Sequence, residues 1–132
     1  MTASSPALPT DAELQILRFL WTRGPSTVRE VHEELYRDTD VGYTTALKLL
    51  QNMLGKGYVT RDEELRQHRY AAAVREDETM RGLVRRLIDK SFEGSAAALA
   101  MHALGAKRAT AGELAELRRL IEELESGESR TS

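Results

Sequence analysis

Six polar side chains fall within one short stretch of the chain, and all of them can hydrogen-bond with phosphates or with the edges of nucleic-acid bases. The stretch holds hydroxyl, amide and ammonium groups, and no carboxylate occurs between residues 42 and 59. The six residues are Tyr43, Thr44, Thr45, Lys48, Gln51 and Asn52. Side chains of these types, gathered so closely, predict a surface that contacts DNA.

Helical spacing divides five of these side chains into two groups, and Gln51, offset from the outward stripe, is a weaker candidate. Thr45, Lys48 and Asn52 recur at intervals of three and four residues, so they share one outward face of a helix. In the groove of a duplex, Lys48 suits the acceptors of guanine and Asn52 can pair with adenine. Tyr43 and Thr44 fall in the first turn, where a helix attracts phosphate. The alternative is a face that is merely solvated, with Tyr43 half-buried beside the helix start.

The opposite side of the same segment is apolar, as a helix that packs on a protein core requires. Its apolar members are Ala46, Leu49, Leu50, Met53 and Leu54. Gly57 is expected to end the helix, and two strands over residues 58–63 and 68–73 are expected to follow around a polar turn. A helix of this kind that leads into a hairpin is typical of the recognition part of a winged helix-turn-helix domain.

The end of this helix and the hairpin carry further candidates for contact with the DNA backbone or the minor groove, namely Lys56, Arg61, Arg66, His68 and Arg69. The formal net charge of the chain is −2, but residues 41–73 hold more basic than acidic side chains. The acidic residues in the hairpin are Asp62, Glu63 and Glu64, and they weaken the local positive field. For Arg66 and His68, a charged turn that keeps the hairpin soluble is an equally good interpretation.

Three further helix starts are marked by a Thr followed three residues later by a Glu, the capping-box pattern. These pairs are Thr10 with Glu13, Thr27 with Glu30 and Thr110 with Glu113. They predict helices from residue 11, over residues 28–36 and from residue 111. The short link at Ser26 and Thr27 leaves room only for a bridge to the hairpin.

From residue 76 onwards, apolar residues at helical spacing predict three more helices. These helices are too apolar for an exposed appendage and too few to bury all their faces alone, which favours a homodimer. The candidate dimerisation residues are Leu83, Leu87, Leu99, Leu114, Leu117, Leu120 and Ile121. The alternative is a monomer in which the three helices pack back onto the first domain.

The expected fold is therefore mainly α: a winged helix-turn-helix domain with a small β-hairpin wing, followed by a C-terminal helical dimerisation region. The expected segments are a flexible N-terminus at 1–9, the DNA-binding domain at 10–74, the dimerisation region at 75–125 and a flexible tail at 126–132.

Composition excludes several classes of function. The chain has 132 residues and no cysteine, so it forms no disulfide, thiolate metal site or cysteine nucleophile. His32, His68 and His102 show no ligand spacing, and His32 is expected on a solvated helix face, so we expect no metal and no cofactor.

No catalytic constellation is evident, which argues against an enzyme. No apolar run is long enough for a membrane span, and we expect a cytoplasmic protein. A winged-helix module that binds proteins and not DNA is the main alternative function.

The order of helices, hairpin and helical tail resembles the BlaI/MecI family of penicillinase and methicillin-resistance repressors over about residues 8–125. In the first helices the resemblance is carried by Glu13, Leu17, Leu20, Trp21, Val28 and Val31. Further along it is carried by Tyr43, Thr44, Thr45, Leu49, Met53, Leu54, Lys56, Gly57, Tyr58, Val59, Arg61, Arg69, Tyr70, Glu113, Leu114 and Leu117.

The resemblance implies a dimeric transcriptional repressor that binds a pseudo-palindromic operator. It also implies derepression through cleavage in the dimerisation region, triggered by a β-lactam-sensing membrane protease as a regulatory partner. The β-lactam repressors are cleaved at an Asn-Phe bond, whereas His102 and Ala103 stand at the matching place here. Copper-responsive relatives bind the metal through a cysteine-rich tail, which this chain lacks.

Overall fold

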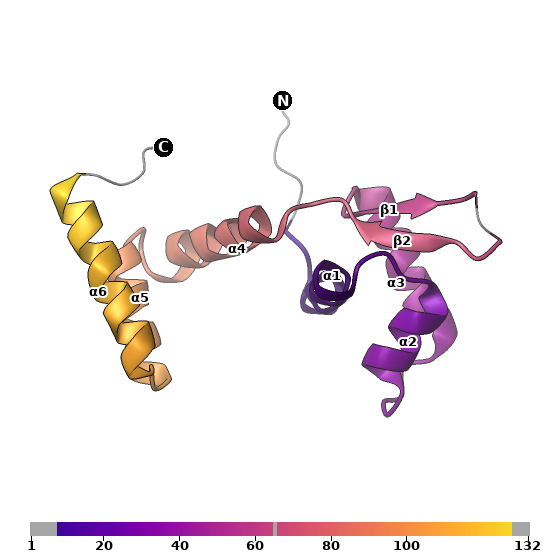
Figure 1. Cartoon of the computed structure of the whole chain (residues 1–132), viewed down its shortest axis with the longest axis horizontal. Coiled ribbons are helices and arrows are strands. Elements are labelled where there is room, and N and C mark those ends of the chain that lie inside the picture. Colours follow the sequence, from indigo (N-terminus) through magenta and orange to yellow (C-terminus); the bar gives the residue numbers. More distant parts are fainter. Residues whose placement is uncertain (1–7, 65, 128–132) are drawn as a thin grey trace. The chain divides into compact units, whose positions relative to one another are not determined.

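The computed structural model describes residues 8–64 and 66–127 of the chain, and these form six helices and one two-stranded sheet (Figure 1). In chain order the elements are α1 (Asp11–Arg23), α2 (Val28–Tyr36), α3 (Tyr43–Lys56), β1 (Val59–Asp62), β2 (Arg69–Ala72), α4 (Glu76–Ser91), α5 (Ala96–Ala106) and α6 (Ala111–Ser126). The predicted fold class, a mainly helical chain with a small hairpin after the third helix, is confirmed.

The three predicted capping boxes are present, and each begins a helix. Thr10 accepts from the Glu13 N–H at 3.2 Å, while the Glu13 carboxylate accepts from the Thr10 N–H at 2.9 Å. The same reciprocal pair opens α2 at Thr27 and Glu30, and α6 at Thr110 and Glu113. Each cap satisfies backbone donors that would otherwise lack a partner, and it contributes about 1 kcal/mol to helix stability.

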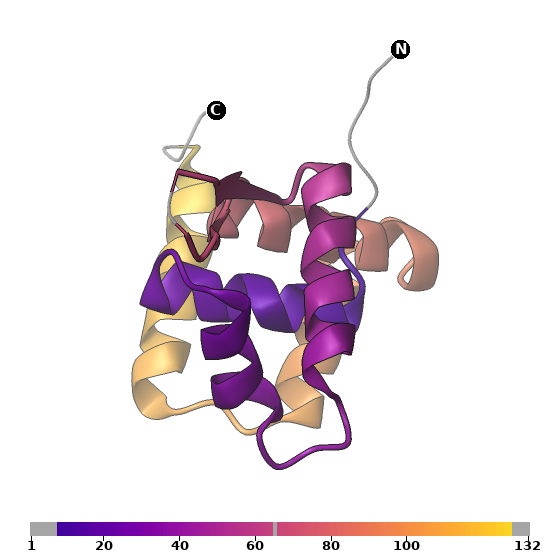
Figure 2. The same ribbon diagram turned by 90° about the vertical axis from the view of Figure 1, so that its right-hand side faces the viewer.

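A single hydrophobic core lies in the first unit, between α1, α2, α3 and the hairpin. Figure 2 shows α1 and α3 crossing each other, with α2 against them. The buried apolar residues are Ile16, Leu17, Leu20, Val28, Val31, Tyr36, Ala46, Leu50, Met53, Tyr58, Val59 and Tyr70. Leu49 and Leu54, expected on the apolar side of α3, are half-buried at the border of this core.

The hairpin pairs β1 with β2 in antiparallel register, with Arg61 opposite Tyr70. The strands are shorter than the predicted 58–63 and 68–73. The first strand, β1, begins at Val59 and not at Tyr58, because the Tyr58 N–H bonds the Met53 carbonyl of α3 at 2.9 Å and so completes the helix terminus. The predicted bridge is confirmed, since Ser26 and Tyr70 exchange backbone hydrogen bonds of 2.9 and 2.8 Å.

The chain divides into two compact units between Arg85 and Arg86, inside α4. The sequence placed the boundary at residue 74, before this helix. The first half of α4 groups with the first unit, where the space beside Gly82 is occupied by Leu8, whose Cδ2 atom lies 3.1 Å from the position of an added Cβ. The Trp21 indole N–H also bonds the Val74 carbonyl at 3.0 Å and fixes the segment that follows β2.

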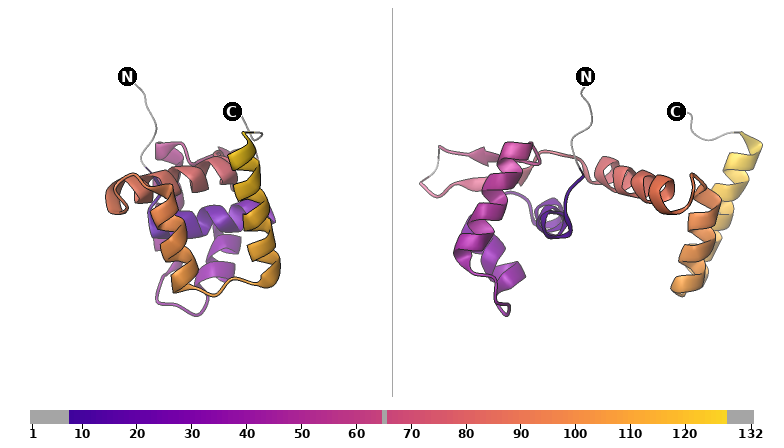
Figure 3. Two further views of the ribbon diagram at one scale, coloured as in Figure 1. Left: turned by 90° about the vertical axis from the view of Figure 1, so that its left-hand side faces the viewer. Right: turned by 180° about the vertical axis from the view of Figure 1, so that it is seen from behind.

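The second unit contains the end of α4 together with α5 and α6. Figure 3 shows α5 and α6 running in opposite directions. None of the three helices α4, α5 and α6 has a buried residue, and they make few contacts with one another. None of the helices described here combines the length and the apolarity that crossing a membrane requires.

Candidate nucleic-acid interface

The interface begins with the two contrasting sides of α3. Ala46, Leu50 and Met53 are fully buried against the rest of the first unit. All six polar residues predicted on the other side are exposed: Tyr43, Thr44, Thr45, Lys48, Gln51 and Asn52. The helix has no acidic residue along its whole length. The structure therefore brings the predicted base-reading side chains onto one accessible, neutral-to-cationic face.

The start of α3 differs from the starts of α1, α2 and α6. Its N-cap is Gly42, which supplies no side-chain acceptor to the backbone N–H groups of the first turn. Tyr43 and Thr44 belong to this first turn, and the Tyr43 side chain is 49% exposed. Because uncapped helix N-termini carry partial positive charge, this end of α3 suits an anion.

His32 holds the turn that leads into α3, a role that the sequence did not reveal. Its Nε2 atom lies 2.9 Å from the Val41 carbonyl oxygen, and its ring packs edge-on to Tyr43 at a centroid distance of 6.3 Å. The expectation of a solvated face was wrong, because the side chain is half-buried. His32 lies four residues before the buried Tyr36, and that helical spacing was the available signal.

Lys56 was predicted as a DNA contact, but its ammonium group has a partner inside the protein. Nζ lies 2.6 Å from Oε2 of Glu13, whose side chain is 4% exposed. Burial alone would raise the pKa of the Glu13 carboxyl. The hydrogen bonds from Lys56 and from the Thr10 backbone outweigh burial and lower this pKa. The same carboxylate raises the pKa of Lys56.

The hairpin residues fall into two groups. Arg61 donates from Nε to Oε2 of Glu63 at 2.9 Å, so part of its charge is offset by an exposed carboxylate two residues along the chain. That contact also lowers the pKa of Glu63. Arg66, His68 and Arg69 are exposed, and none of them joins an ion pair in the part of the chain that the structure describes. These three remain available to an external anion.

Most of the predicted dimerisation residues are exposed to solvent. Leu87, Leu114, Leu117, Leu120 and Ile121 are exposed, with Ile121 at 54%. Leu83 and Leu99 are half-buried. His102 and Ala103 lie within α5 and are exposed, and the His102 ring packs on Phe92 at a centroid distance of 5.4 Å. In residues 8–64 and 66–127, no group of His, Asp and Glu side chains is arranged to hold a metal ion.

Comparison with known proteins assigns the family. The model of the penicillinase repressor family matches residues 9–123, which include both units. The chain belongs to the penicillinase repressor family. It is 39% identical over 119 residues to the transcriptional regulator BlaI of Mycobacterium tuberculosis, in two strains, covering 89% of this chain and 85% of that protein. The predicted relationship to BlaI-type repressors is confirmed, and so is the predicted class of function, a DNA-binding transcriptional repressor.

One solved structure agrees with the fold. A transcriptional regulator from Thermotoga maritima superposes with a TM-score of 0.50 at 20% identity, covering 92% of this chain and 80% of that one. Bacillus licheniformis BlaI, solved in monomeric form in complex with the blaP half-operator, gives a TM-score of 0.49 at 23% identity over 56% of this chain and 90% of that one.

Proposed function

We propose that this penicillinase repressor family member binds a pseudo-palindromic operator as a homodimer, and that each protomer places α3 in the major groove. The observation that carries the proposal is the exposed, acid-free face of α3, on a helix whose other face is buried in the core. A helix that presents short polar and cationic side chains in this way fits a major groove of about 12 Å width.

Within α3, different residues contact the bases and the phosphates. Lys48 and Asn52 lie one helical turn apart on the outward face, so both reach the floor of a groove that admits the helix. Lys48 then donates to guanine, and Asn52 forms a bidentate pair with adenine. Thr44 and Tyr43, at the uncapped start of the helix, donate to phosphate.

In the hairpin, the proposal assigns backbone contact to Arg66, His68 and Arg69, whose charged or polar ends are exposed. Lys56 and Arg61 act inside the protein, because each is bound to a carboxylate. The Lys56 contact joins the end of α3 to α1, and the Arg61 contact is local to the hairpin. The net attraction to DNA therefore comes from fewer side chains than the number of basic residues suggests.

The homodimer follows from the apolar surface of the second unit. Its helices expose five large apolar side chains: Leu104, Leu117, Leu120, Ile121 and Leu124. Exposed apolar side chains gathered in this way usually mark an interface. A second copy of the chain supplies the matching surface by two-fold symmetry, and two copies of α3 then address two half-sites.

Regulatory cleavage at His102 and Ala103 has a structural requirement. Both residues lie inside α5, whose backbone is hydrogen-bonded along its length. Because proteolytic nicking concentrates in exposed loops, a protease would reach this bond only after local unwinding of α5.

The test of the proposed function is selection of bound fragments from a pool of random duplexes, using the full-length chain. We expect enrichment of one inverted repeat, with a dissociation constant that rises steeply with salt. About six to ten phosphate contacts per dimer would weaken binding by roughly 10³–10⁵ between 50 and 200 mM salt. A pool that yields no enriched sequence, with no salt-sensitive binding, would overturn the proposal in favour of a protein-binding module.

A further inference from the structure

A groove with a volume of about 260 Å³ opens in the first unit, between the start of α2, the start of α3 and the turn of the hairpin. Its polar walls are formed by Arg29, Tyr43, Arg66 and His68, and its apolar lining includes Leu47. No acidic residue lines the groove. Three segments that are distant in sequence therefore place several hydrogen-bond donors around one small space.

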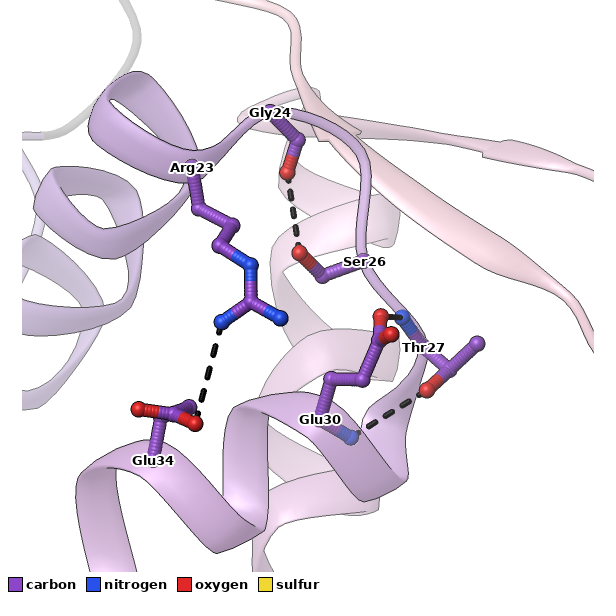
Figure 4. A network of polar contacts seen from close by, with 6 residues as sticks. All are labelled: Arg23, Gly24, Ser26, Thr27, Glu30 and Glu34. Atoms are coloured by element: carbon purple, nitrogen blue, oxygen red, sulfur yellow. Dashed lines mark hydrogen bonds and ion pairs between the residues drawn. The ribbon is translucent and has the colours of Figure 1, made fainter.

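The start of α2, which lines the groove, is capped by its own side chains. There, the Thr27 hydroxyl accepts from the Glu30 N–H at 3.1 Å, and the Glu30 carboxylate accepts from the Thr27 N–H at 2.9 Å (Figure 4). This capping box gives the backbone N–H groups of Thr27 and Glu30 acceptors within the protein. An anion in the groove would depend on the guanidinium groups of Arg29 and Arg66.

Arg29 and Arg66 are both exposed, and neither takes part in an ion pair among the residues that the structure describes. Two carboxylates of α2 already have partners elsewhere (Figure 4): Glu30 is part of the capping box, and Oε2 of Glu34 lies 3.8 Å from Nη1 of Arg23 at the end of α1. The groove thus holds two guanidinium groups whose charges remain available to a ligand.

We infer that this groove seats one backbone phosphate of the operator, and that Arg29 is a DNA contact of the repressor. The inference rests on the proposed function and extends it to α2, a helix to which we assigned no DNA contact. Tyr43 lines the groove and also belongs to the exposed face of α3, so the two surfaces are continuous. A duplex that lies along α3 therefore brings its sugar-phosphate backbone to the mouth of the groove.

The chemistry of the donors favours a phosphate. Guanidinium groups bind phosphate oxygens in bidentate fashion, and contacts of this kind position a protein on DNA without reading its sequence. Arg29 would set the register of α3 in the groove of the duplex, while Arg66 and His68 close the site from the hairpin side. Loss of Arg29 should therefore weaken binding to every duplex by the same factor.

The experiment compares Arg29→Gln with Arg18→Gln in the full-length chain, on a duplex selected from the random pool and on a scrambled duplex. Arg18 is an exposed arginine on α1 that lies outside the groove, so its variant is a matched control for net charge. For Arg29→Gln we expect the slope of log K against log salt to fall by about 0.9 per protomer. Between 50 and 200 mM salt this corresponds to about a threefold smaller loss of affinity per protomer. The ratio of affinities for the two duplexes should stay unchanged.

A second measurement locates the contact on the DNA. Duplexes with one neutral methylphosphonate at successive positions should show one position per half-site at which wild-type binding weakens and Arg29→Gln binding weakens clearly less, because Arg66 and His68 remain. If the slope for Arg29→Gln equals that for wild type and for Arg18→Gln, and no such position exists, the groove holds no phosphate. Normal, selective binding by wild type in that case leaves the proposed function standing. Failure of wild type itself to bind a duplex selectively would remove both.

Discussion

The Nζ atom of Lys56 lies 2.6 Å from Oε2 of Glu13, so the last residue of α3 is bonded to the first turn of α1. The other carboxylate oxygen of Glu13 accepts from the Thr10 backbone N–H at 2.9 Å and closes the capping box of α1. One carboxylate thus caps the start of α1 and bonds the side chain of the last residue of α3. The pair joins α3 to α1 in addition to the packing of Ala46, Leu50 and Met53 in the core.

Replacing Glu13 by Gln should destabilise the chain at pH 7 by about 1–3 kcal/mol, because a hydrogen bond between charged groups is lost at a buried site. The pKa of Glu13 is lower in the folded protein than its ordinary value of 4.5. Its stabilising contribution is therefore complete above pH 4.5 and is lost as the pH falls through the lower, folded value. Urea unfolding at several pH values should show the difference between wild type and variant closing on acidification.

The control for this prediction is Glu33→Gln, which removes an exposed carboxylate on α2 that joins no ion pair in the described residues. Its effect should stay within about 0.5 kcal/mol at every pH. A constant gap between wild type and Glu13→Gln from pH 7 down to pH 3 would contradict the role given to the ion pair.

Replacing Lys48 by Ala should weaken binding to the selected operator and relax the preference at one base position per half-site. The expected loss is about 1–3 kcal/mol, the usual value of a good direct base contact. Lys107→Ala removes the same charge beyond the end of α5 and should leave the base preference intact. Unchanged preference in Lys48→Ala, measured by repeating the selection, would remove this residue as a base contact.

The double variant Leu117→Asp with Leu120→Asp should yield a monomer, because it places two charges within the exposed apolar stripe of α6. Binding to the full operator should then fall to the level of binding to a half-site. Ala115→Asp adds a charge on the other side of the same helix and should preserve the dimer. Light scattering reads the mass directly, and a dimeric mass for the double variant would exclude this face of α6 from the interface.

Gly82 offers a test of the contact between Leu8 and α4. An alanine within a helix is favoured over glycine by about 1 kcal/mol, but the added Cβ would lie 3.1 Å from Leu8 Cδ2. We expect Gly82→Ala to stabilise a Leu8→Ala background by about 1 kcal/mol and to stabilise wild type by less. Equal urea midpoint shifts in the two backgrounds, at one fixed protein concentration, would show that Leu8 does not pack on this helix.

Features specified by neighbouring residues were predictable from the sequence. The capping threonines marked the starts of α1, α2 and α6, and the apolar spacing of α3 separated its buried side from its exposed side. Such signals lie within one or two helical turns, where backbone geometry fixes which side chains meet.

Pairings between distant segments were not predictable in this way. Lys56 and Glu13 are 43 residues apart, and no local pattern indicates that a basic residue at the end of α3 has an internal acceptor. The groove at Arg29 is formed by three separate segments, and the sequence indicated only that the link before α2 bridges to the hairpin. The sequence shows which residues are charged. Whether a charged side chain is free to bind DNA depends on which other side chains the tertiary structure places next to it.

No side chain of α5 or α6 is fully buried within one chain, and dependence on a second copy would make the repressor sensitive to its own abundance. If two copies must meet before two half-sites are occupied, operator occupancy at low expression follows the square of the number of chains. Halving the number of repressors would then reduce occupancy about fourfold under mass action. A modest fall in synthesis would be converted into a sharp release of the promoter.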